Sequence, residues 1–285
     1  MEPLDMLASI PLTPYPSLEP MKALSALLST QRGPWPTFEL LCCYAKLWKH
    51  LPEDTKAGRS ATDTALLNHV SRQIKATYSD LVFLLPCSDS IAICDASSPG
   101  SITHRRVSAF VRSFSLPITK TTSLKPVVAL ALPNGPLLGL AILAVTAYYT
   151  AAPMTITSGG EQFKSDILQS GAKTILAVKA DITRLGLHEI WVRHNGISVV
   201  LLDMNADMTF DMTHIDESPV VPHMGHTPNG PDDFALVLFT SGTSGKKKIV
   251  PYTVHTLVAG IGFVIESWGL TADDACLNMM PLFHV

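Results

Sequence analysis

The sequence predicts an α/β fold in which strands and helices are packed in layers. From about residue 90, short apolar runs alternate with runs of helical spacing, as in strand–helix–strand units. The uncharged stretch 126–153 is divided by a P-N-G-P turn at 133–136 into a short buried strand and a longer buried helix. A chain of 285 residues that is 47% hydrophobic can bury the core that such layers need.

The composition argues against several classes of partner. A net charge of −3 supplies no basic field for a phosphate backbone, so we expect no nucleic-acid binding. The turn at 133–136 leaves two pieces shorter than the roughly 20 apolar residues that a membrane-spanning helix needs, so we expect no membrane span. Five cysteines, an odd number without zinc-site spacing, indicate reduced thiols, and the start of the chain does not resemble a secretory signal. We therefore expect a cytoplasmic location.

Residues 1–87 are the least informative part of the chain and are predicted to be mostly helical. Apolar side chains recur at helical spacing over 21–30, 38–51 and 62–78, and Thr62 is a plausible N-cap of the third helix. The apolar run 81–85 is predicted to be a strand. We treat 1–87 as a separate N-terminal segment and 88–285 as the second domain.

The second domain carries the alternating pattern in order. Thr103 is predicted to cap a helix over 104–114, Pro136 to open the helix that follows the first buried strand, and Gly171 to end a helix over 162–170. A further short helix is predicted near 182–187. The predicted strands lie at 91–94, 127–132, 151–156, 174–178, 190–193 and 198–203.

Residues 204–233 show no period and are predicted to form a long surface connection. His223 and His226 form an H-x-x-H pair there. Zinc needs three or four ligands, so we interpret both as solvated loop histidines and predict no metal site.

The chemistry is concentrated after the apolar strand 234–239. That strand runs into a loop rich in Ser, Thr and Gly and then into three lysines, 246–248. Glycines allow a turn whose exposed N–H groups form a nest for an anion, while hydroxyls and lysines add donors and charge. Because 253–268 has helical spacing, we predict that the loop lies between a strand and a helix. It is not a Walker loop, and its composition alone also fits a flexible linker.

Two motifs carry a resemblance to a known family. The segment LFTSGTSGKKKIV at 238–250 resembles the signature loop of the adenylate-forming superfamily, usually T-S-G-T-T-G-x-P-K-G, which includes acyl-CoA synthetases, luciferases and nonribosomal peptide synthetase adenylation domains. The segment MPLFHV at 280–285 resembles the next motif, P-L-F-H, at a similar separation. The resemblance covers 88–285, with looser matches at 101–106 and 143–153, and the wording of 127–150 is closest to fungal synthetase-like proteins.

The resemblance implies a fold, a reaction and a site. The fold is the front part of the family's large N-terminal domain. The reaction is activation of a carboxylic acid by ATP with Mg²⁺ to an acyl-adenylate, then transfer to a thiol of CoA or phosphopantetheine. The residues that the resemblance assigns to the β- and γ-phosphates are Thr240, Ser241, Gly242, Thr243, Ser244 and Gly245. Lys248 would hold the pyrophosphate leaving group, and His284 would border the carboxylate pocket.

The chain also departs from the family. Lys247 replaces the usual proline and Ile249 the usual glycine, which predicts a stiffer, more cationic loop exit. The family's segments for adenine, magnesium and ribose follow the P-L-F-H motif, so we expect a truncated chain that is inactive alone and works with the missing C-terminal half or a carrier domain. The alternative is a non-catalytic remnant or interaction protein that keeps the fold without binding nucleotide.

Overall fold

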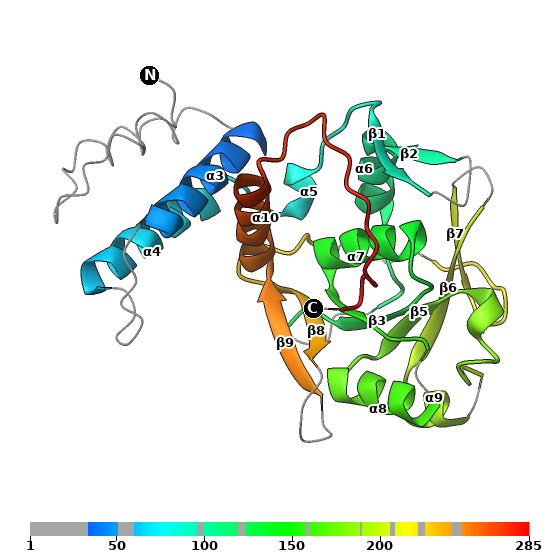
Figure 1. The fold of residues 1–285 in the computed structure, drawn as a ribbon. Helices are drawn as coiled ribbons and strands as arrows, with labels where there is room; N and C mark the ends of the chain where they lie inside the picture. The colour runs from blue at the N-terminus through cyan, green and yellow to red at the C-terminus, as the bar shows by residue number, and fades with distance from the viewer. Residues whose placement is uncertain are drawn as a thin grey trace. The chain divides into compact units, whose positions relative to one another are not determined.

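The computed structural model describes residues 34–50, 60–95, 100–118, 124–157, 160–188, 190–205, 209–221, 226–240 and 247–284 (Figure 1). The chain divides into two compact units, which are described separately below. The first contains the described residues up to Ser79 together with His255–Leu277, and the second contains Asp80–Val254 together with 278–284. The helical run predicted at 21–30 lies outside the described residues.

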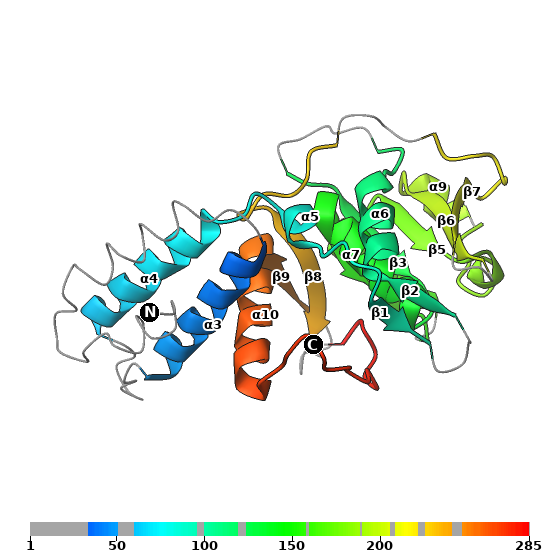
Figure 2. The ribbon, with the colours of Figure 1, turned by 90° about the horizontal axis from the view of Figure 1, so that it is seen from above.

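The described part of the first unit is helical, and it includes the helices predicted at 38–51 and 62–78. It consists of α3 (Pro34–His50), α4 (Ala61–Lys75) and the greater part of α10 (Val254–Trp268), and Figure 2 shows α3 and α4 side by side. A close approach joins α3 to α10, because a Cβ atom on Gly262 would lie only 2.4 Å from that of Leu41. Phe263 packs edge-on against Tyr44 next to this contact, with ring centroids 5.8 Å apart. A residue larger than glycine at 262 would therefore separate the two helices.

Helix α4 confirms the helix predicted at 62–78, but its cap is different. The N-cap is Ser60, whose Oγ accepts a hydrogen bond from the Asp63 N–H at 3.1 Å. Thr62 lies within the first turn, so its prediction as the cap was wrong. The other end of the helix is tied to α10, because Ser71 Oγ and Tyr78 Oη lie 2.7 and 2.8 Å from the two ring nitrogens of His255.

The second unit contains a seven-stranded sheet in the order β7-β6-β5-β3-β4-β8-β9. Strands β3, β4, β5, β6 and β8 run parallel, and β7 and β9 pair antiparallel with the last strand at either side. This arrangement confirms the predicted α/β fold. The strands are β3 (Val127–Ala131), β4 (Thr150–Pro153), β5 (Thr174–Ala177), β6 (Ser198–Met204), β7 (Phe210–His214), β8 (Phe234–Thr240) and β9 (Lys248–Thr253).

Helices cover both faces of this sheet (Figure 1). Val128 and Leu130 of β3 point into one core, which they share with α6 (His104–Ser113) and α7 (Pro136–Tyr148). Ala129 and Ala131 point into the other core, with α8 (Gly160–Ser170) and α9 (Ile190–His194). The alternation follows from the two-residue period of a strand, and burial on both faces explains why β3 is apolar throughout. A separate hairpin, β1 (Ile91–Cys94) and β2 (Ser101–Thr103), precedes α6.

Several predicted boundaries are confirmed by their local chemistry. Thr103 Oγ1 accepts a hydrogen bond from the Arg106 N–H and caps α6. Pro136 occupies the first turn of α7, where its missing N–H leaves no gap in the helix. Gly171 has a φ of +74°, the left-handed conformation that ends α8.

Three short elements differ from the prediction. Residues Leu81–Leu84 form the helix α5 rather than a strand, because Asp80 Oδ1 accepts a hydrogen bond from the Phe83 N–H and caps the turn. Residues 190–194 form α9 rather than a strand, since only Val192 of this segment is buried. The predicted helix near 182–187 is a set of turns after the 3₁₀ helix η1 (Lys179–Asp181). In runs this short, an apolar composition does not distinguish strand from helix.

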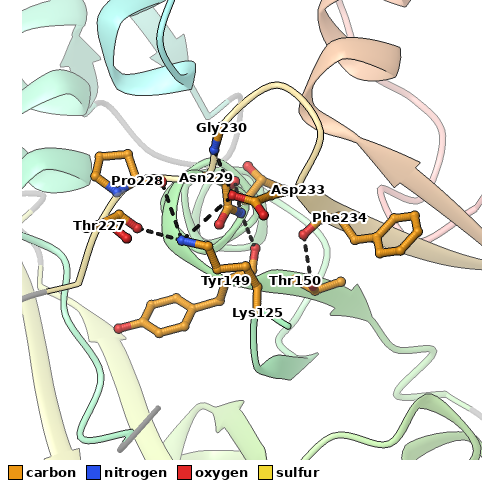
Figure 3. A network of polar contacts seen from close by, with 10 residues as sticks. Lys125, Tyr149, Thr150, Thr227, Pro228, Asn229, Gly230, Asp233 and Phe234 are labelled. Carbon is orange, nitrogen blue, oxygen red and sulfur yellow. Dashed lines mark hydrogen bonds and ion pairs between the residues drawn. The ribbon is translucent and has the colours of Figure 1, made fainter. Parts of the chain in front are cut away.

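The amino-terminal ends of β3, β4 and β8 are joined by a polar network (Figure 3). Lys125, just before β3, donates to the carbonyl of Thr227 at 2.7 Å and lies 4.0 Å from Asp233. Asn229 is fully buried and donates from Nδ2 to the carbonyl of Tyr149 at 2.8 Å. Thr150, the first residue of β4, donates to the carbonyl of Phe234 at 2.8 Å. These contacts fix the start of β8 relative to its neighbours.

The described part of the segment 204–233 differs from the prediction of an irregular surface connection. It contains β7, which pairs with β6 in register from Val200–His214 to Met204–Phe210. No helix in the described part of the chain is long and apolar enough to cross a membrane.

Candidate functional site

The carboxyl ends of β3 and β4 form a switch point in the sheet. Helix α7 follows β3 and covers one face, whereas α8 follows β4 and covers the other. The connections therefore leave these two neighbouring strands in opposite directions, and open α/β sheets bind ligands in the crevice at such a point. Strand β8 lies next to β4 and runs parallel to it, so the carboxyl end of β8 belongs to the same edge.

The loop that follows β8 connects two strands. Thr240, the last residue of β8, pairs directly with Lys248, the first residue of β9. The prediction that the loop lies between a strand and a helix was wrong, because α10 begins only at Val254. Residues 248–253 form a strand instead, since they pair along β8 and Ile249 packs against the core beside α8. The anion-binding dipole of a helix N-terminus is therefore not located at this loop.

The structure places part of the predicted site. Thr240 is half-buried and Lys248 is exposed, and the two face each other across the hairpin at the carboxyl end of β8. The remaining residues of the predicted set lie in the segment 241–246, outside the described residues, and they are Ser241, Gly242, Thr243, Ser244 and Gly245.

The second motif is held at the carboxyl end of β3. The Leu282 N–H donates to Asn134 Oδ1 at 2.9 Å, and the Leu282 side chain packs against the core beneath α7. The His284 N–H donates to the carbonyl of Pro281 at 3.0 Å, and the His284 side chain is exposed. Only β4 separates β3 from β8, so the two strands that lead to the motifs lie about 10 Å apart in the sheet, at twice the usual strand spacing.

Asn134 is a residue of this region whose role the sequence reasoning missed. Its turn was interpreted only as the break between a strand and a helix. The available signal was an amide side chain immediately after a buried strand, where side chains reach the ligand-binding edge of an α/β sheet.

The exit of the loop is anchored by an ion pair that was also missed. Lys247 Nζ lies 2.6 Å from Oδ2 of Asp166, a carboxylate of α8 whose side chain is only 4% exposed. The expectation of a more cationic exit is therefore not met at Lys247, because Asp166 neutralises its charge. The signal was an acidic residue on the buried face of a predicted helix, which requires a cation nearby.

The H-x-x-H pair is only partly described. His223 lies outside the described residues. His226 is half-buried, with its ring 5.0 Å from that of Tyr149 and its Nε2 3.3 Å from the carbonyl oxygen of Leu116. The interpretation of His226 as a solvated loop residue was therefore wrong. Within the described segments, no group of three or more His, Cys, Asp or Glu side chains could hold a metal ion.

An open groove lies between α8 and α9, and its lining includes Gln169, which contacts the main chain of Lys247. Glu161, Lys164, Leu168 and Trp191 line it, and Lys164 Nζ lies 5.6 Å from the centre of the Trp191 ring. None of the predicted site residues that the structure describes lines this groove. We therefore place the candidate site at the carboxyl edge of the sheet.

Comparison with known proteins identifies the class. The family described as AMP-binding enzyme matches residues 86–285, and the chain belongs to this family. An oxalate–CoA ligase of Arabidopsis thaliana is 30% identical over 188 residues, which are 65% of this chain and 36% of that protein. A 2-succinylbenzoate–CoA ligase of Staphylococcus aureus (strain MSSA476) is 33% identical over 90 residues, which are 30% of this chain and 18% of that protein.

The solved structures confirm the fold. ATP-bound MatB from Rhodopseudomonas palustris superposes with a TM-score of 0.54 at 17% identity, over 72% of this chain and 41% of MatB. The predicted resemblance to the front part of the large domain of adenylate-forming enzymes is thus confirmed at the level of fold and family. The chain spans 36% of the length of the oxalate–CoA ligase and 41% of that of MatB.

Proposed function

We propose that this chain supplies the ATP phosphate site of an enzyme that converts a carboxylic acid to an acyl-adenylate. The observation that carries the proposal is the pairing of Thr240 with Lys248 at the carboxyl end of β8, beside the switch point of the sheet. A hydroxyl donor and a cation there suit a bound polyphosphate, and the neighbouring 280–285 motif is held on the same edge through Asn134.

The described residues fit the chemistry of an ATP phosphate group. In our proposal, Lys248 offsets the negative charge that develops on the pyrophosphate leaving group. Thr240 and the residues 241–245 donate hydrogen bonds to the β- and γ-phosphates. Mg²⁺ would be held chiefly by phosphate oxygens and water, because this ion is usually bound through one or two carboxylates plus the substrate's phosphates.

His284 is proposed to border the pocket for the acid. Its exposed side chain lies in the segment that Asn134 fixes at the carboxyl end of β3, close to the proposed phosphate site. Adenylation requires the acid in line with the α-phosphorus, so a group that borders the acid must lie at the same edge as the phosphate donors. The names of the two CoA ligases support a carboxylic acid substrate and CoA as the thiol acceptor in the whole protein. Phosphopantetheine is the other acceptor that we propose to test.

Calorimetric titration of MgATP into a polypeptide of residues 1–285 tests the phosphate site. Lys248→Ala is expected to weaken binding about tenfold or more, as for loss of a charge-assisted contact. Gly242→Val is expected to weaken MgATP binding by a similar factor, because valine restricts the backbone conformations that are open to glycine. Lys173→Ala is the matched control, since this exposed lysine lies just before β5 at the opposite, amino edge of the sheet. Unchanged MgATP binding in both site variants contradicts the proposal. Absence of MgATP binding by the wild-type polypeptide also contradicts it, and that outcome favours a non-catalytic protein.

Turnover is tested separately by pyrophosphate exchange. We propose that residues 1–285 alone bind MgATP without completing adenylation, because in the family the contacts to adenine and ribose come from segments that follow the P-L-F-H motif. A panel of oxalate, 2-succinylbenzoate, fatty, aromatic and amino acids is expected to give no exchange. Robust exchange with any of these acids contradicts this part of the proposal.

A further inference from the structure

Helix α8 carries a carboxylate on the face that packs against the sheet. Phe163 and Ile167 of this face are fully buried in the core, and Asp166 lies between them with only 2% of its surface exposed. A carboxylate in such a position is strongly disfavoured unless a cation and hydrogen-bond donors compensate it. Asp166 therefore identifies a place where the chain has built a specific polar contact.

The contacts of Asp166 lead directly to the loop exit. Gln162 Nε2 donates to Asp166 Oδ1 at 2.8 Å, and Lys247 Nζ donates to Asp166 Oδ2 at 2.6 Å. A second side chain of α8 completes the contact, because Gln169 Nε2 donates to the main-chain carbonyl of Lys247 at 2.6 Å. The ammonium of Lys247 also lies 5.9 Å from the ring centre of Phe239, within the range of a cation–π contact.

These contacts hold both the side chain and the main chain of Lys247. This residue lies between the loop and β9, immediately before Lys248. Since α8 is fixed by its buried face, a residue tied to α8 at two points has little freedom of its own. The position and direction of the first residue of β9 are thereby set by a helix on the face of the sheet.

We propose that Asp166 is a positioning residue, which acts through Lys247 to fix the exit of the phosphate loop and so to place the Lys248 ammonium for phosphate binding. This inference rests on the proposed function. The resemblance places a proline at position 247 in the family, and proline restricts the main chain at this point without any partner. In this chain, the buried ion pair replaces that covalent restraint.

A structural role for Asp166 alone would have a different signature. If Asp166 only stabilised the packing of α8, its loss would lower stability, and no change at residue 247 would repair the loop. If Asp166 positions the loop exit, proline at 247 restores the restraint once the carboxylate has been neutralised. Lys247→Met in the same background removes the lysine charge without adding the restraint and is the matched control.

The experiment compares Asp166→Asn with the double variants Asp166→Asn/Lys247→Pro and Asp166→Asn/Lys247→Met. Hydrogen–deuterium exchange is followed in the peptide covering 247–253, and MgATP affinity is measured on the same samples. Asp166→Asn is expected to speed exchange and weaken MgATP binding, each about tenfold, as for the loss of a buried charged hydrogen bond. The double variant with proline is expected to recover both quantities to within about threefold of wild type, and the one with methionine is not. Glu161→Gln, a neutralised carboxylate on the exposed side of α8, is expected to change neither.

Each other outcome contradicts the inference. An unaltered Asp166→Asn variant shows that the ion pair does not hold the exit. Equal recovery with proline and methionine shows that only the unpaired charge mattered, and recovery with neither shows that Asp166 supports packing alone. The proposed function can fail independently, because a wild-type protein that binds no MgATP still reports on the restraint through hydrogen exchange.

Discussion

Asn134 is the residue through which a distant part of the chain reaches the edge of the sheet. Its side-chain oxygen accepts the Leu282 N–H at 2.9 Å across a sequence separation of 148 residues. Leu282 then packs against the core beneath α7. One amide thus sets where the segment carrying His284 begins.

Asn134→Ala is expected to release the segment 281–284, because it removes the acceptor of the Leu282 N–H. The free energy that holds this segment closed should fall by about 1 kcal/mol, as for the loss of one hydrogen bond. Hydrogen exchange of the Leu282 amide, measured by NMR, should therefore be about fivefold faster. Asn134→Asp keeps an acceptor and should retain protection. Asn278→Ala is the control, since the Asn278 side chain contacts only the nearby carbonyl of Met280 among the contacts described. Unchanged exchange in Asn134→Ala contradicts this role.

Tyr149 makes the stability of the second unit depend on pH in the alkaline range. Burial raises its pKa above the ordinary value near 10, and the Leu116 N–H, which donates to Oη at 3.0 Å, lowers it by a smaller amount. The folded state therefore keeps its proton at a pH where the unfolded state has lost it. The stabilisation is complete below about pH 10 and is lost as the pH rises through the folded-state pKa.

Tyr149→Phe is expected to show both effects in urea unfolding. At pH 7 the variant should lose about 1 to 3 kcal/mol, because the buried Leu116 N–H has no acceptor. Between pH 10 and 12 its stability should fall less steeply than that of the wild type. If the stabilities of the two proteins fell in parallel over that range, Tyr149 would have the same pKa in the folded and unfolded states, which would contradict this role.

At the scale of elements, α7 is the helix whose ends control the edge of the sheet. Its first turn follows the Asn134 turn, and its last turn is closed by Asn229. Asn229 Nδ2 donates to the carbonyl of Tyr149 (Figure 3) and to that of Thr146, and its main-chain N–H donates to the carbonyl of Ala147. Its Oδ1 is the one buried side-chain oxygen or nitrogen in the described segments with no hydrogen-bond partner.

Asn229→Asp is expected to destabilise the second unit more than Asn229→Ala does. Alanine loses two hydrogen bonds to the end of α7, at about 1 to 3 kcal/mol. Aspartate in addition places a negative charge against two carbonyls at the negative end of the helix dipole. The difference should shrink as the pH is lowered and the carboxyl becomes protonated. Thermal unfolding at pH 7 and pH 4 measures this difference in stability between the two variants. Asn278→Asp, at an exposed position, is the control. Equal destabilisation by the two substitutions would contradict this capping role.

The elements also show what the sequence could and could not predict. Strong signals were confirmed, such as the buried strand 127–131 followed by Pro136, and the Thr103 cap of α6. Short elements failed, because Leu81–Leu84 and Ile190–His194 are too brief for their period to decide between strand and helix. Strand β9 was missed because Pro251 and a lysine run mask its pattern, which becomes visible only through its pairing with β8.

For the whole molecule, the family could be predicted from two motifs, whereas the arrangement around them could not. The order of 238–250 and 280–285 along the chain indicated the adenylate-forming fold, and the family match over 86–285 confirms it. That Asn134 would receive Leu282, or Asp166 would bind Lys247, depends on contacts across 148 and 81 residues. Contacts of such sequence separation leave no local pattern. The boundary at residue 87 and the roles of residues 1–87 stay predictions.

The central claim is that the carboxyl edge of the sheet, at the ends of β3 and β8, binds the phosphates of ATP. Hydrogen–deuterium exchange of residues 1–285 with and without saturating MgATP tests it most directly. Protection is expected in the peptides covering 234–240, 247–253 and 280–284, with no change in β6, β7 or the α9 side of the groove between α8 and α9. Protection confined to that groove or to the helices of the first unit, or no protection anywhere, would contradict the account.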